Sequence, residues 1–362
     1  GIPVIGEMEL AAGTIAEPIL AVTGTNGKTT TTQLVGNMLV NSGKKVFVGG
    51  NIGIPLIAYA DGAHGRADVV VAETSSFQLD TAIDFRPDTA VMLNITDDHL
   101  DRYASFSAYA DAKWRIFKNQ RPTDAAVLNA MDATVTAMIE KRPPIARRHL
   151  FSDQAVARGA RILKQRIQLM DQGRQTGSFA LDKTGLIGPH NRENVAAACL
   201  AAREQGATDT GIQQAIDEFR GLPHRLETVG TVEGVRFVND SKATNVDAVN
   251  RALECFERPV VLILGGQNKK GDFKRLKSQV RRRVKTLVAM GESKDEIVTA
   301  LAGDPQKGIL EAGSMEEAVE KARGAAQAGE TVLLSPACAS FDMFANYAHR
   351  GDRFREIVKG LI

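Results

Sequence analysis

The chain has 362 residues, of which 43% are hydrophobic and 24% are charged, and its formal net charge is +2. These values are ordinary for a globular enzyme of two or three domains, and the small net charge gives no indication of a nucleic-acid partner. The apolar runs are too short to span a bilayer, which argues against a membrane protein. Three widely separated cysteines with no CxxC pair are typical of a reducing, cytoplasmic compartment.

The first third of the chain alternates short apolar runs with helical patterns. We expect strands at 18–24, 44–50, 67–73 and 88–94, and helices at 29–41 and 111–119. Because these strands are apolar throughout and are separated by helices, they predict a mainly parallel sheet covered on both faces.

The middle of the chain, residues 124–184, has a less regular pattern, and its segment 141–148 is expected to be a surface connection. A helix is expected next, over residues 191–206, and a turn-rich junction follows it. Further strands are expected at 235–240, 259–266, 286–291 and 330–337. This restart predicts a second α/β domain that begins near Leu222.

A glycine-rich turn, GTNGKT, lies between the first expected strand and the first expected helix. This arrangement gathers backbone N–H groups at the positive end of a helix, where they can bind a phosphate. Gly24 and Gly27 permit a tight turn. Lys28 can reach the outer phosphates, and the Thr29 hydroxyl can bind Mg²⁺. The alternative is a glycine turn with a surface lysine, and the strand–loop–helix context favours the phosphate site.

Polar residues follow two further strands of the same predicted sheet. Glu73 ends one of them, where it either holds Mg²⁺ opposite the loop or faces water. A second cluster, which contains Asp97, Asp98, His99 and Asp101, follows the next strand. His99 is either a metal ligand or a hydrogen-bonded structural residue, and the cluster around it favours a site. Lys113, on an amphipathic helix, is expected from its own surroundings to be a surface residue.

The second half offers polar residues near the expected domain junction. Asn194 lies at the start of a helix, and Arg225, Asp240, Lys242 and Thr244 follow in two turn-rich segments. These side chains either bind a nucleotide across a cleft or cap helices. Polar residues also follow the strands at 259–266 and 330–337, and they are expected to face a cleft. Ser340 is in addition a plausible helix N-cap.

Eight motifs occur in an order that resembles the Mur ligase family. They are GTNGKTT, ETSSFQLD, NITDDHLDRY, GPHNREN, GLPHRLE, NDSKATN, LGGQNKKGDF and SPACASFDMFANYAHRGDRF. The resemblance covers essentially the whole chain, and within the family it favours the members that add D-glutamate. The family has the shorter GTNGKT loop, which explains why Val22 stands where a full Walker A motif has glycine.

The resemblance implies a central P-loop ATPase domain at residues 15–221 and a C-terminal Rossmann-like, amino-acid-binding domain at residues 222–362. Family members also have an N-terminal domain that binds the UDP end of the substrate. Residues 1–14 are expected to be a remnant of that domain, and GIPVIGEMEL is expected to be its last strand.

The resemblance also implies a reaction and its cofactors, ATP and Mg²⁺. ATP would phosphorylate the alanyl carboxylate of UDP-N-acetylmuramoyl-L-alanine, and the amine of D-glutamate would attack the resulting acyl phosphate in peptidoglycan biosynthesis. The positions that match nucleotide-binding residues of the family are Gly24, Thr25, Asn26, Gly27, Lys28, Thr29, Thr30, Asn194, Arg225 and Asp240.

Other positions match catalytic and metal-binding residues of the family. The catalytic positions are Lys28, Asn51, Glu73, His99 and Lys113. Thr29 and Glu73 match ligands of the first Mg²⁺, and His99 matches a ligand of the second. Lys113 aligns with a lysine that the family carries as a carbamate, which would support the second metal.

D-Glutamate is expected to bind to the C-terminal domain. The matching positions are Lys242, Thr244, Lys269, Ser340, Phe341 and Tyr347, the last of which is often phenylalanine in the family. The DNPR motif of the lysine- and diaminopimelate-adding relatives is absent, which favours D-glutamate.

Two alternatives stay open at this point. One is another ATP-dependent ligase of the family or a folylpolyglutamate synthase. The other is a nucleotide-binding or regulatory module without ligase activity, because the UDP-binding domain is not part of the sequence. In the leading interpretation the protein is a cytoplasmic monomer that binds ATP but ligates weakly or not at all as this chain.

Overall fold

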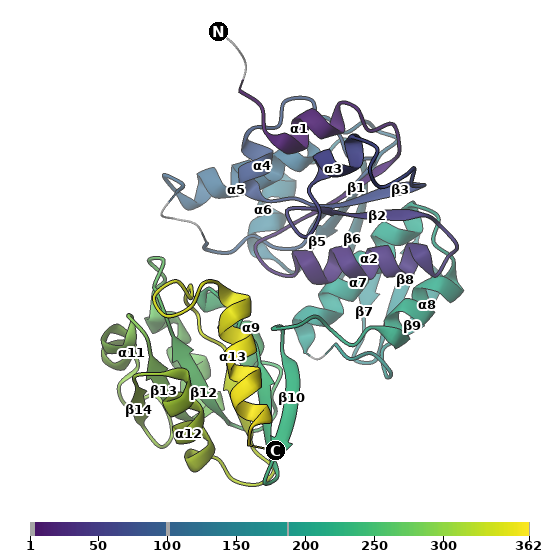
Figure 1. Cartoon of the computed structure of the whole chain (residues 1–362). Helices are drawn as coiled ribbons and strands as arrows, with labels where there is room; N and C mark the ends of the chain where they lie inside the picture. The colour runs from purple at the N-terminus through teal and green to yellow at the C-terminus, as the bar shows by residue number, and fades with distance from the viewer. Residues whose placement is uncertain (1–3, 99–101, 187, 362) are drawn as a thin grey trace. The chain divides into compact units, whose positions relative to one another are not determined.

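The computed structural model describes residues 4–98, 102–186 and 188–361. The chain forms two compact α/β units, one built mainly from the residues up to Arg220 and the other mainly from Gly221 onward (Figure 1). Both sheets are mainly parallel, as the sequence predicts. Among the helices in these ranges, none is long and apolar enough to cross a membrane.

The first unit is built around a nine-stranded sheet with the order β2-β3-β1-β4-β5-β6-β7-β8-β9. Its strands are β1 (Ile19–Thr23), β2 (Val46–Gly50), β3 (Val69–Glu73), β4 (Thr89–Met92), β5 (Ala125–Asn129), β6 (Arg147–Ser152), β7 (Gly159–Ile162), β8 (Arg166–Asp171) and β9 (Arg174–Ala180). Neighbouring strands from β2 to β7 run parallel, and β8 and β9 extend the sheet by antiparallel pairing.

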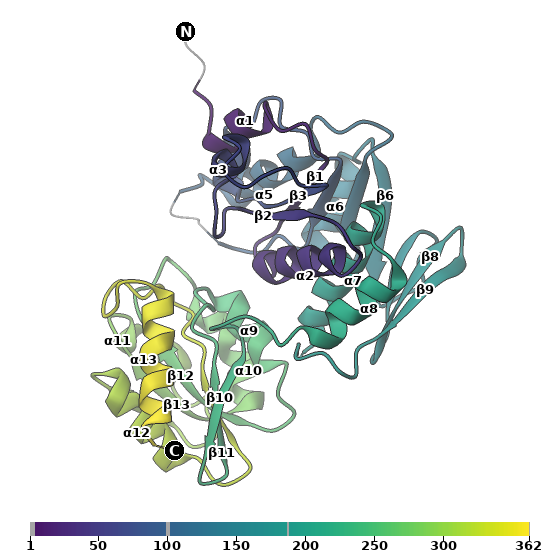
Figure 2. The ribbon, with the colours of Figure 1, turned by 45° about the vertical axis from the view of Figure 1, so that its right-hand side comes forward.

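Helices cover both faces of this sheet, as its fully apolar central strands require. They are α1 (Glu7–Ala12), α2 (Lys28–Val40), α3 (Leu56–Ala60), α4 (Ser76–Asp80), α5 (Phe106–Trp114), the 3₁₀ turn η1 (Arg115–Phe117), α6 (Ala133–Lys141), α7 (Pro189–Glu204) and α8 (Asp209–Glu218). One core cluster joins α1, α3, α4, α5 and α6 to one face. Helices α2, α7 and α8 lie together on the other face (Figure 2).

Two expectations for this unit are wrong. The described part of the first ten residues contains helix α1 and no strand, because Met8 and Ala11 lie one turn apart and are both fully buried. The segment 124–184 is not irregular, since it contains β5 to β9 and α6. In its outer strands, two alternate residues of β8 and one residue of β9 are buried, a weaker pattern than the apolar runs of the centre.

The second unit has a six-stranded sheet with the order β10-β11-β15-β12-β13-β14. The strands are β10 (Glu227–Val232), β11 (Val235–Asn239), β12 (Val260–Gly265), β13 (Val284–Met290), β14 (Ile309–Ala312) and β15 (Thr331–Leu334). Only β10 is antiparallel to its neighbour in this described sheet. The helices are α9 (Val246–Leu253), η2 (Phe273–Leu276), α10 (Lys277–Arg283), α11 (Lys294–Leu301), α12 (Met315–Ala325) and α13 (Tyr347–Lys359). Separate core clusters on the two faces give three layers.

Candidate functional site

The glycine-rich loop lies at a point where neighbouring strands send the chain in opposite directions. The connection after β1 leads to β2, and the connection after the adjacent β4 leads to β5 on the other side. In open α/β sheets ligands bind at such a point, outside the carboxyl ends of the strands. The loop runs from the end of β1 at Thr23 to the start of α2 at Lys28.

Two glycines allow the loop to follow its path. Gly27 is the N-cap of α2 with a φ of 87°, a left-handed conformation that suits glycine. A Cβ on Gly27 would lie 2.3 Å from the Oδ1 atom of Asn194, so the side chain from α7 closes over the loop. A Cβ on Gly24 would lie 2.9 Å from the Leu93 Cβ atom. The backbone therefore packs here more closely than side chains permit.

Asn94, which the sequence analysis did not single out, holds the tip of the loop. Its side chain is 3% exposed, accepts from the Asn26 N–H at 2.8 Å and donates to the Asn26 carbonyl at 3.0 Å. The Asn94 carbonyl also accepts from the Thr25 N–H at 2.9 Å. Because a buried side chain satisfies both backbone groups of Asn26, the end of β4 fixes the shape of the loop.

Thr25 provides a second attachment. Its hydroxyl lies 3.1 Å from the Tyr109 hydroxyl and 3.2 Å from the Thr96 carbonyl, to which it donates. The N–H of Thr96 donates in turn to the Thr25 hydroxyl at 3.0 Å. Tyr109 belongs to α5, so the loop is connected to a helix as well as to two strands.

Two lysine ammonium groups meet at one carbonyl of the loop. Lys28 Nζ donates to the carbonyls of Gly24 and Thr25, both at 2.9 Å. Lys113 Nζ donates to the Gly24 carbonyl at 2.8 Å and lies 4.8 Å from the centroid of the Tyr109 ring. Lys113 is only 2% exposed, so the expectation of a surface residue is wrong. The pattern around it failed because α5 is apolar on more than one face, and the lysine reaches inward to the loop.

Glu73 lies next to the loop, at the end of β3, which pairs with β1 in a register that sets Glu73 opposite Val22. Its Oε1 atom accepts from the Asn51 side chain at 2.9 Å. Its Oε2 atom is buried and has no hydrogen-bond partner among the described residues. The carboxylate is 2% exposed, so it is not the water-facing acid of the alternative interpretation. A buried oxygen of this kind is costly unless a ligand satisfies it.

The remaining predicted residues of this region surround the start of α2. Thr29 and Thr30 occupy its first turn, and Thr30 is 5% exposed. Asn194 lies in α7, is 5% exposed and donates to Asn191 Oδ1 at 3.1 Å. The structure thus brings Gly24–Thr30, Asn51, Glu73, Lys113 and Asn194 to one edge of one unit. His99 and Asp101 lie outside the described residues.

The oxygen atoms available as metal ligands at this edge fit a magnesium ion. The Thr29 hydroxyl and the buried Glu73 carboxylate are oxygen ligands of the kind that Mg²⁺ prefers, and few protein ligands suffice because Mg²⁺ keeps several waters. No group of three or more His, Cys, Asp and Glu side chains suited to a metal occurs within residues 4–98, 102–186 and 188–361. A site here would therefore depend on Thr29, Glu73 and non-protein ligands.

In the second unit, Asp240 follows β11 and is 8% exposed. It accepts from the Leu226 N–H at 3.2 Å and from the Ser335 hydroxyl at 2.8 Å. Burial raises the pKa of Asp240 to about 7, although these hydrogen bonds and the nearby Arg225 oppose the rise. Arg225 directly precedes Leu226, which donates to Asp240, so the two predicted nucleotide-binding residues, Arg225 and Asp240, lie in the same part of the unit.

Lys242 and Tyr347 meet in the same unit. The Lys242 ammonium lies 3.7 Å from the centroid of the Tyr347 ring, a cation–π contact between the turn after β11 and the start of α13. The Lys242 N–H donates to the His224 carbonyl at 3.0 Å. Thr244 is half-buried two residues further on.

The segments after β12 and β15 carry the other predicted amino-acid contacts. Gln267 and Ala339 exchange two backbone hydrogen bonds of 2.9 Å, which fixes the two segments side by side. Ser340 is 2% exposed, whereas Phe341 is 65% exposed and Lys269 is exposed. Asn346, rather than Ser340, is the N-cap of α13. All six predicted residues follow the carboxyl ends of neighbouring strands in one sheet.

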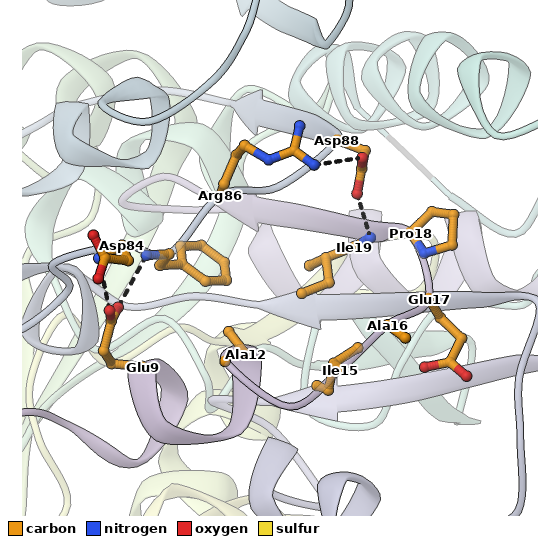
Figure 3. Close-up of a pocket in the computed structure, with 12 residues that line it drawn as sticks. Glu9, Ala12, Ile15, Ala16, Glu17, Pro18, Ile19, Asp84, Arg86 and Asp88 are labelled. Carbon is orange, nitrogen blue, oxygen red and sulfur yellow. Dashed lines mark hydrogen bonds and ion pairs between the residues drawn. The ribbon is translucent and has the colours of Figure 1, made fainter.

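A separate pocket of about 320 Å³ lies at the opposite edge of the first sheet (Figure 3). It is lined by Glu9 of α1, by the residues before β1 and by Asp84, Arg86 and Asp88 before β4. No sequence motif indicates this pocket, since its carboxylates come from three separate segments.

Comparison with known families gives matches over both units. The family model "Mur ligase middle domain" matches residues 22–202, and "Mur ligase, glutamate ligase domain" matches residues 224–338. The chain is 49% identical to a UDP-N-acetylmuramoylalanine--D-glutamate ligase of Desulfosudis oleivorans, over 100% of this chain and 78% of the relative. It is 46% identical to the protein of the same name from Pelotomaculum thermopropionicum, over 100% of the chain and 79% of the relative.

Solved structures share the fold at lower identity. MurF ligase of Thermotoga maritima in complex with ADP aligns with a TM-score of 0.72 and 19% identity, over 98% of this chain and 82% of that one. Escherichia coli FolC in complex with DHPP and ADP aligns with a TM-score of 0.70 and 17% identity, over 98% of this chain and 93% of that one. At these identities the likeness shows the fold alone.

Proposed function

Because the chain belongs to the Mur ligase family, we propose that it provides the ATP- and amino-acid-binding parts of a ligase that adds D-glutamate to UDP-N-acetylmuramoyl-L-alanine. Relatives with 46% and 49% identity over the whole chain carry the name of that activity. The product is a precursor of peptidoglycan. We assign residues 15–221 to ATP binding, residues 222–362 to amino-acid binding and residues 1–14 to the edge of a UDP-substrate domain.

The observation that carries the proposal is the loop between β1 and α2 beside the unpartnered oxygen of Glu73. The left-handed Gly27 turns the chain so that the first N–H groups of α2 are offered at one point, next to Lys28. A helix N-terminus with a lysine binds the phosphates of a nucleotide. A buried carboxylate at the end of the neighbouring strand is suited to the accompanying cation.

Thr29 and Glu73 would hold Mg²⁺, with His99 and a carbamylated Lys113 as ligands of a second ion. Bound Mg²⁺ neutralises charge on phosphate oxygens as the γ-phosphoryl group moves. Lys28 supports the same charge by turning from the loop carbonyls toward the outer phosphates. Asn51, which donates to Glu73 Oε1, would leave the other carboxylate oxygen available to the cation.

The reaction requires the acceptor carboxylate to attack the γ-phosphorus, which releases ADP and leaves an acyl phosphate. The amine of D-glutamate then attacks the acyl carbon. The amide forms as the bond between this carbon and the phosphate oxygen breaks, which releases inorganic phosphate, and the amine loses a proton to solvent. Neither step needs a nucleophile from the protein, so positioning and electrostatic support supply the catalysis. We assign Asn194, Arg225 and Asp240 to the nucleotide, the carboxylate of Asp240 being suited to ribose hydroxyls.

We assign the recognition of D-glutamate to the carboxyl edge of the second sheet. The ammonium groups of Lys242 and Lys269 would meet the two carboxylates of the amino acid. Thr244 and Ser340 offer hydroxyls, and Phe341 and Tyr347 offer aromatic surface. The cation–π contact with Tyr347 restrains Lys242, and the extra hydroxyl of this tyrosine does not prevent that contact.

The chain spans 78% of the length of its Desulfosudis relative, so binding energy from the UDP group is expected to come from the part not covered. We therefore expect this chain to bind ATP but to ligate weakly by itself. Its location in the cytoplasm and its monomeric state remain predictions.

Phosphate release tests the proposal. The chain would be joined to the uncovered N-terminal part of the Desulfosudis relative and supplied with ATP, UDP-N-acetylmuramoyl-L-alanine and one of D-glutamate, L-glutamate or meso-diaminopimelate. We expect D-glutamate to give at least about 100-fold more turnover than either competitor. Equal turnover with L-glutamate or meso-diaminopimelate would overturn the substrate assignment. ATP binding without phosphate release for any amino acid would favour the nucleotide-binding module instead.

A further inference from the structure

Arg350 is a buried cation in the second unit that the proposed chemistry does not use. It lies in the first turns of α13 and is 1% exposed, although arginine is rarely buried without a partner. Burial lowers its pKa to about 10, so it is still protonated at neutral pH. No carboxylate lies within ion-pair distance of its guanidinium in the part of the chain that the structure describes.

The guanidinium instead donates to neutral oxygens of two loops. Its Nε atom donates to the Ser241 hydroxyl at 2.9 Å, and Nη2 donates to the Ser241 carbonyl at 2.8 Å. Nη2 also donates to the Cys338 carbonyl at 3.1 Å, and Nη1 donates to the Ala339 carbonyl at 3.2 Å. The planar fork of arginine can hold these oxygens in one fixed arrangement, which lysine cannot do.

These contacts lie within two residues of positions assigned to the amino-acid substrate. Ser241 precedes Lys242, and Ala339 precedes Ser340. The Ser241 hydroxyl, which accepts from Arg350, donates to the Tyr347 carbonyl at 2.8 Å. A single side chain therefore connects the turn after β11, the turn after β15 and the start of α13.

The packing leaves the guanidinium little freedom. A Cβ on Gly266, in the turn after β12, would lie 3.1 Å from Nη1 and 2.3 Å from the Ala339 carbonyl oxygen. The Arg350 side chain therefore fills the space between the turns after β11, β12 and β15. A purely structural role could be filled by a neutral donor without the cost of burying a charge.

We propose that Arg350 is a positioning residue that sets the spacing of the three segments carrying Lys242, Ser340 and Tyr347, and thereby sets the affinity for the amino-acid substrate. This inference rests on the proposed function. Its consequence is selective: the amino-acid site changes when Arg350 is replaced, and the phosphate loop of the other unit does not.

The first test is steady-state kinetics of Arg350→Lys and Arg350→Met in the joined enzyme described above. We expect the KM for the amino acid to rise by about 10- to 100-fold in Arg350→Met, with partial recovery in Arg350→Lys and a KM for ATP within twofold of the parent. The matched control is Arg353→Met, on the same helix, where an exposed arginine pairs with Glu316. This control should leave both KM values unchanged.

The second test does not depend on activity. Cys338 is fully buried and lies in the segment that Arg350 holds, so its reaction with Ellman's reagent reports local opening. In a Cys199→Ser, Cys255→Ser background, we expect Arg350→Met to raise the labelling rate by about tenfold or more. Ser241→Ala, which removes only the hydroxyl that links Arg350 to Tyr347, should raise it by a smaller factor. This second variant keeps the test decisive if Arg350→Met does not fold.

Labelling rates unchanged in both variants would overturn the inference, whatever the substrate is. A parallel rise of both KM values would also overturn it, because that result indicates general damage. If the parent enzyme rejects D-glutamate, the substrate proposal fails by itself. The labelling test and the KM for whichever amino acid is accepted would then still test Arg350.

Discussion

The two edges of the nine-stranded sheet are built from the same strands but differ in the hydrogen-bond partners of their carboxylates. At the amino edge, around the pocket of Figure 3, Glu9 accepts from the N–H groups of Asp84 and Phe85 at 2.6 and 3.0 Å. Asp88 accepts from the Ile19 N–H at 2.9 Å. At the carboxyl edge, Glu73 keeps a buried oxygen without a partner among the described residues.

The difference separates stabilising carboxylates from functional ones. A carboxylate that accepts backbone N–H groups joins segments and adds stability. An unpartnered buried carboxylate and a left-handed glycine beside a helix N-terminus cost stability, and such features persist where a ligand uses them. Changes at the carboxyl edge should therefore affect ligand chemistry, and changes at the amino edge should affect stability.

The largest effect is expected for Lys28→Ala. The change removes the ammonium that would meet the outer phosphates, so turnover of the joined enzyme should fall by about 1,000-fold or more. The free energy of unfolding should change by less than about 1 kcal/mol, because the carbonyls of Gly24 and Thr25, to which the Lys28 ammonium donates, lie within four residues of it in the same turn. Lys45→Ala, an exposed lysine of the same unit, is the control. Unchanged ATP affinity and turnover in Lys28→Ala would remove the phosphate role of the loop.

The next largest effect on turnover is expected for Glu73→Gln. The amide keeps an oxygen that can accept from Asn51 but loses the negative charge, so we expect about 100-fold lower turnover and a higher Mg²⁺ requirement. Titration of turnover with Mg²⁺ measures both effects. An unaltered Mg²⁺ dependence would show that this carboxylate does not hold the cation.

At the carboxyl edge of the second sheet, a buried carboxyl group, that of Asp240, should make stability depend on pH. Burial raises the folded-state pKa of Asp240 from 3.8 to about 7, so the folded state favours the protonated carboxyl. The stability gained from this preference is complete below pH 3.8 and is lost as the pH rises toward 7. We expect the free energy of unfolding to fall by roughly 2–4 kcal/mol over this range in the parent and to change little in Asp240→Asn. Hydrogen exchange of β11 and β15 amides at pH 5 and pH 8 measures it. Identical pH profiles for the two proteins would contradict the shifted pKa.

Gly27→Ala and Gly43→Ala form a matched pair, with φ values of 87° and 83°. Alanine at Gly43 meets no atom within 4 Å, so only the left-handed backbone costs stability, about 1 kcal/mol. Alanine at Gly27 must also displace the Asn194 side chain, so we expect about 2 kcal/mol and weaker ATP binding. Urea unfolding and ATP titration of both variants check this order. Equal losses of stability and equal ATP affinities would mean that the Asn194 contact has no effect.

The smallest effect is expected at the amino edge. Glu9→Ala removes the acceptor of two backbone N–H groups that remain partly accessible to water, so we expect a loss of about 1 kcal/mol in the free energy of unfolding. Glu9→Gln, which keeps one acceptor oxygen, should lose less. Turnover and ATP affinity should stay unchanged in both. A loss of ATP affinity in either variant would show that the two edges are not separable.

The sequence predicts the central strands and the loop well because both depend on local signals. The apolar runs that become β1, β3 and β4 need no partner to be recognised, and the glycines of the loop specify their own turn. The motifs likewise bring Asn51 and Glu73 to one edge, since parallel strands present their carboxyl ends together.

Other features depend on tertiary packing and were not predictable. The sequence around Lys113 is typical of a surface residue and does not indicate its contact with Gly24. The sequence around Asn94 likewise does not indicate its hydrogen bonds with Asn26. The role of Arg350 could not be recognised from the sequence either, because the oxygens to which it donates come from segments 109 and 12 residues away in the chain. Long-range hydrogen bonds leave no periodic trace in a sequence.

The central claim, that the carboxyl edge of the first sheet is the ATP site, is tested most directly by hydrogen exchange with and without ATP and Mg²⁺. We predict protection of the peptides that carry Gly24–Lys28 and Asn94, with no change in the peptides that carry Glu9 and residues 84–88. Protection at the amino edge, or protection at neither edge while ATP is bound, would contradict the account.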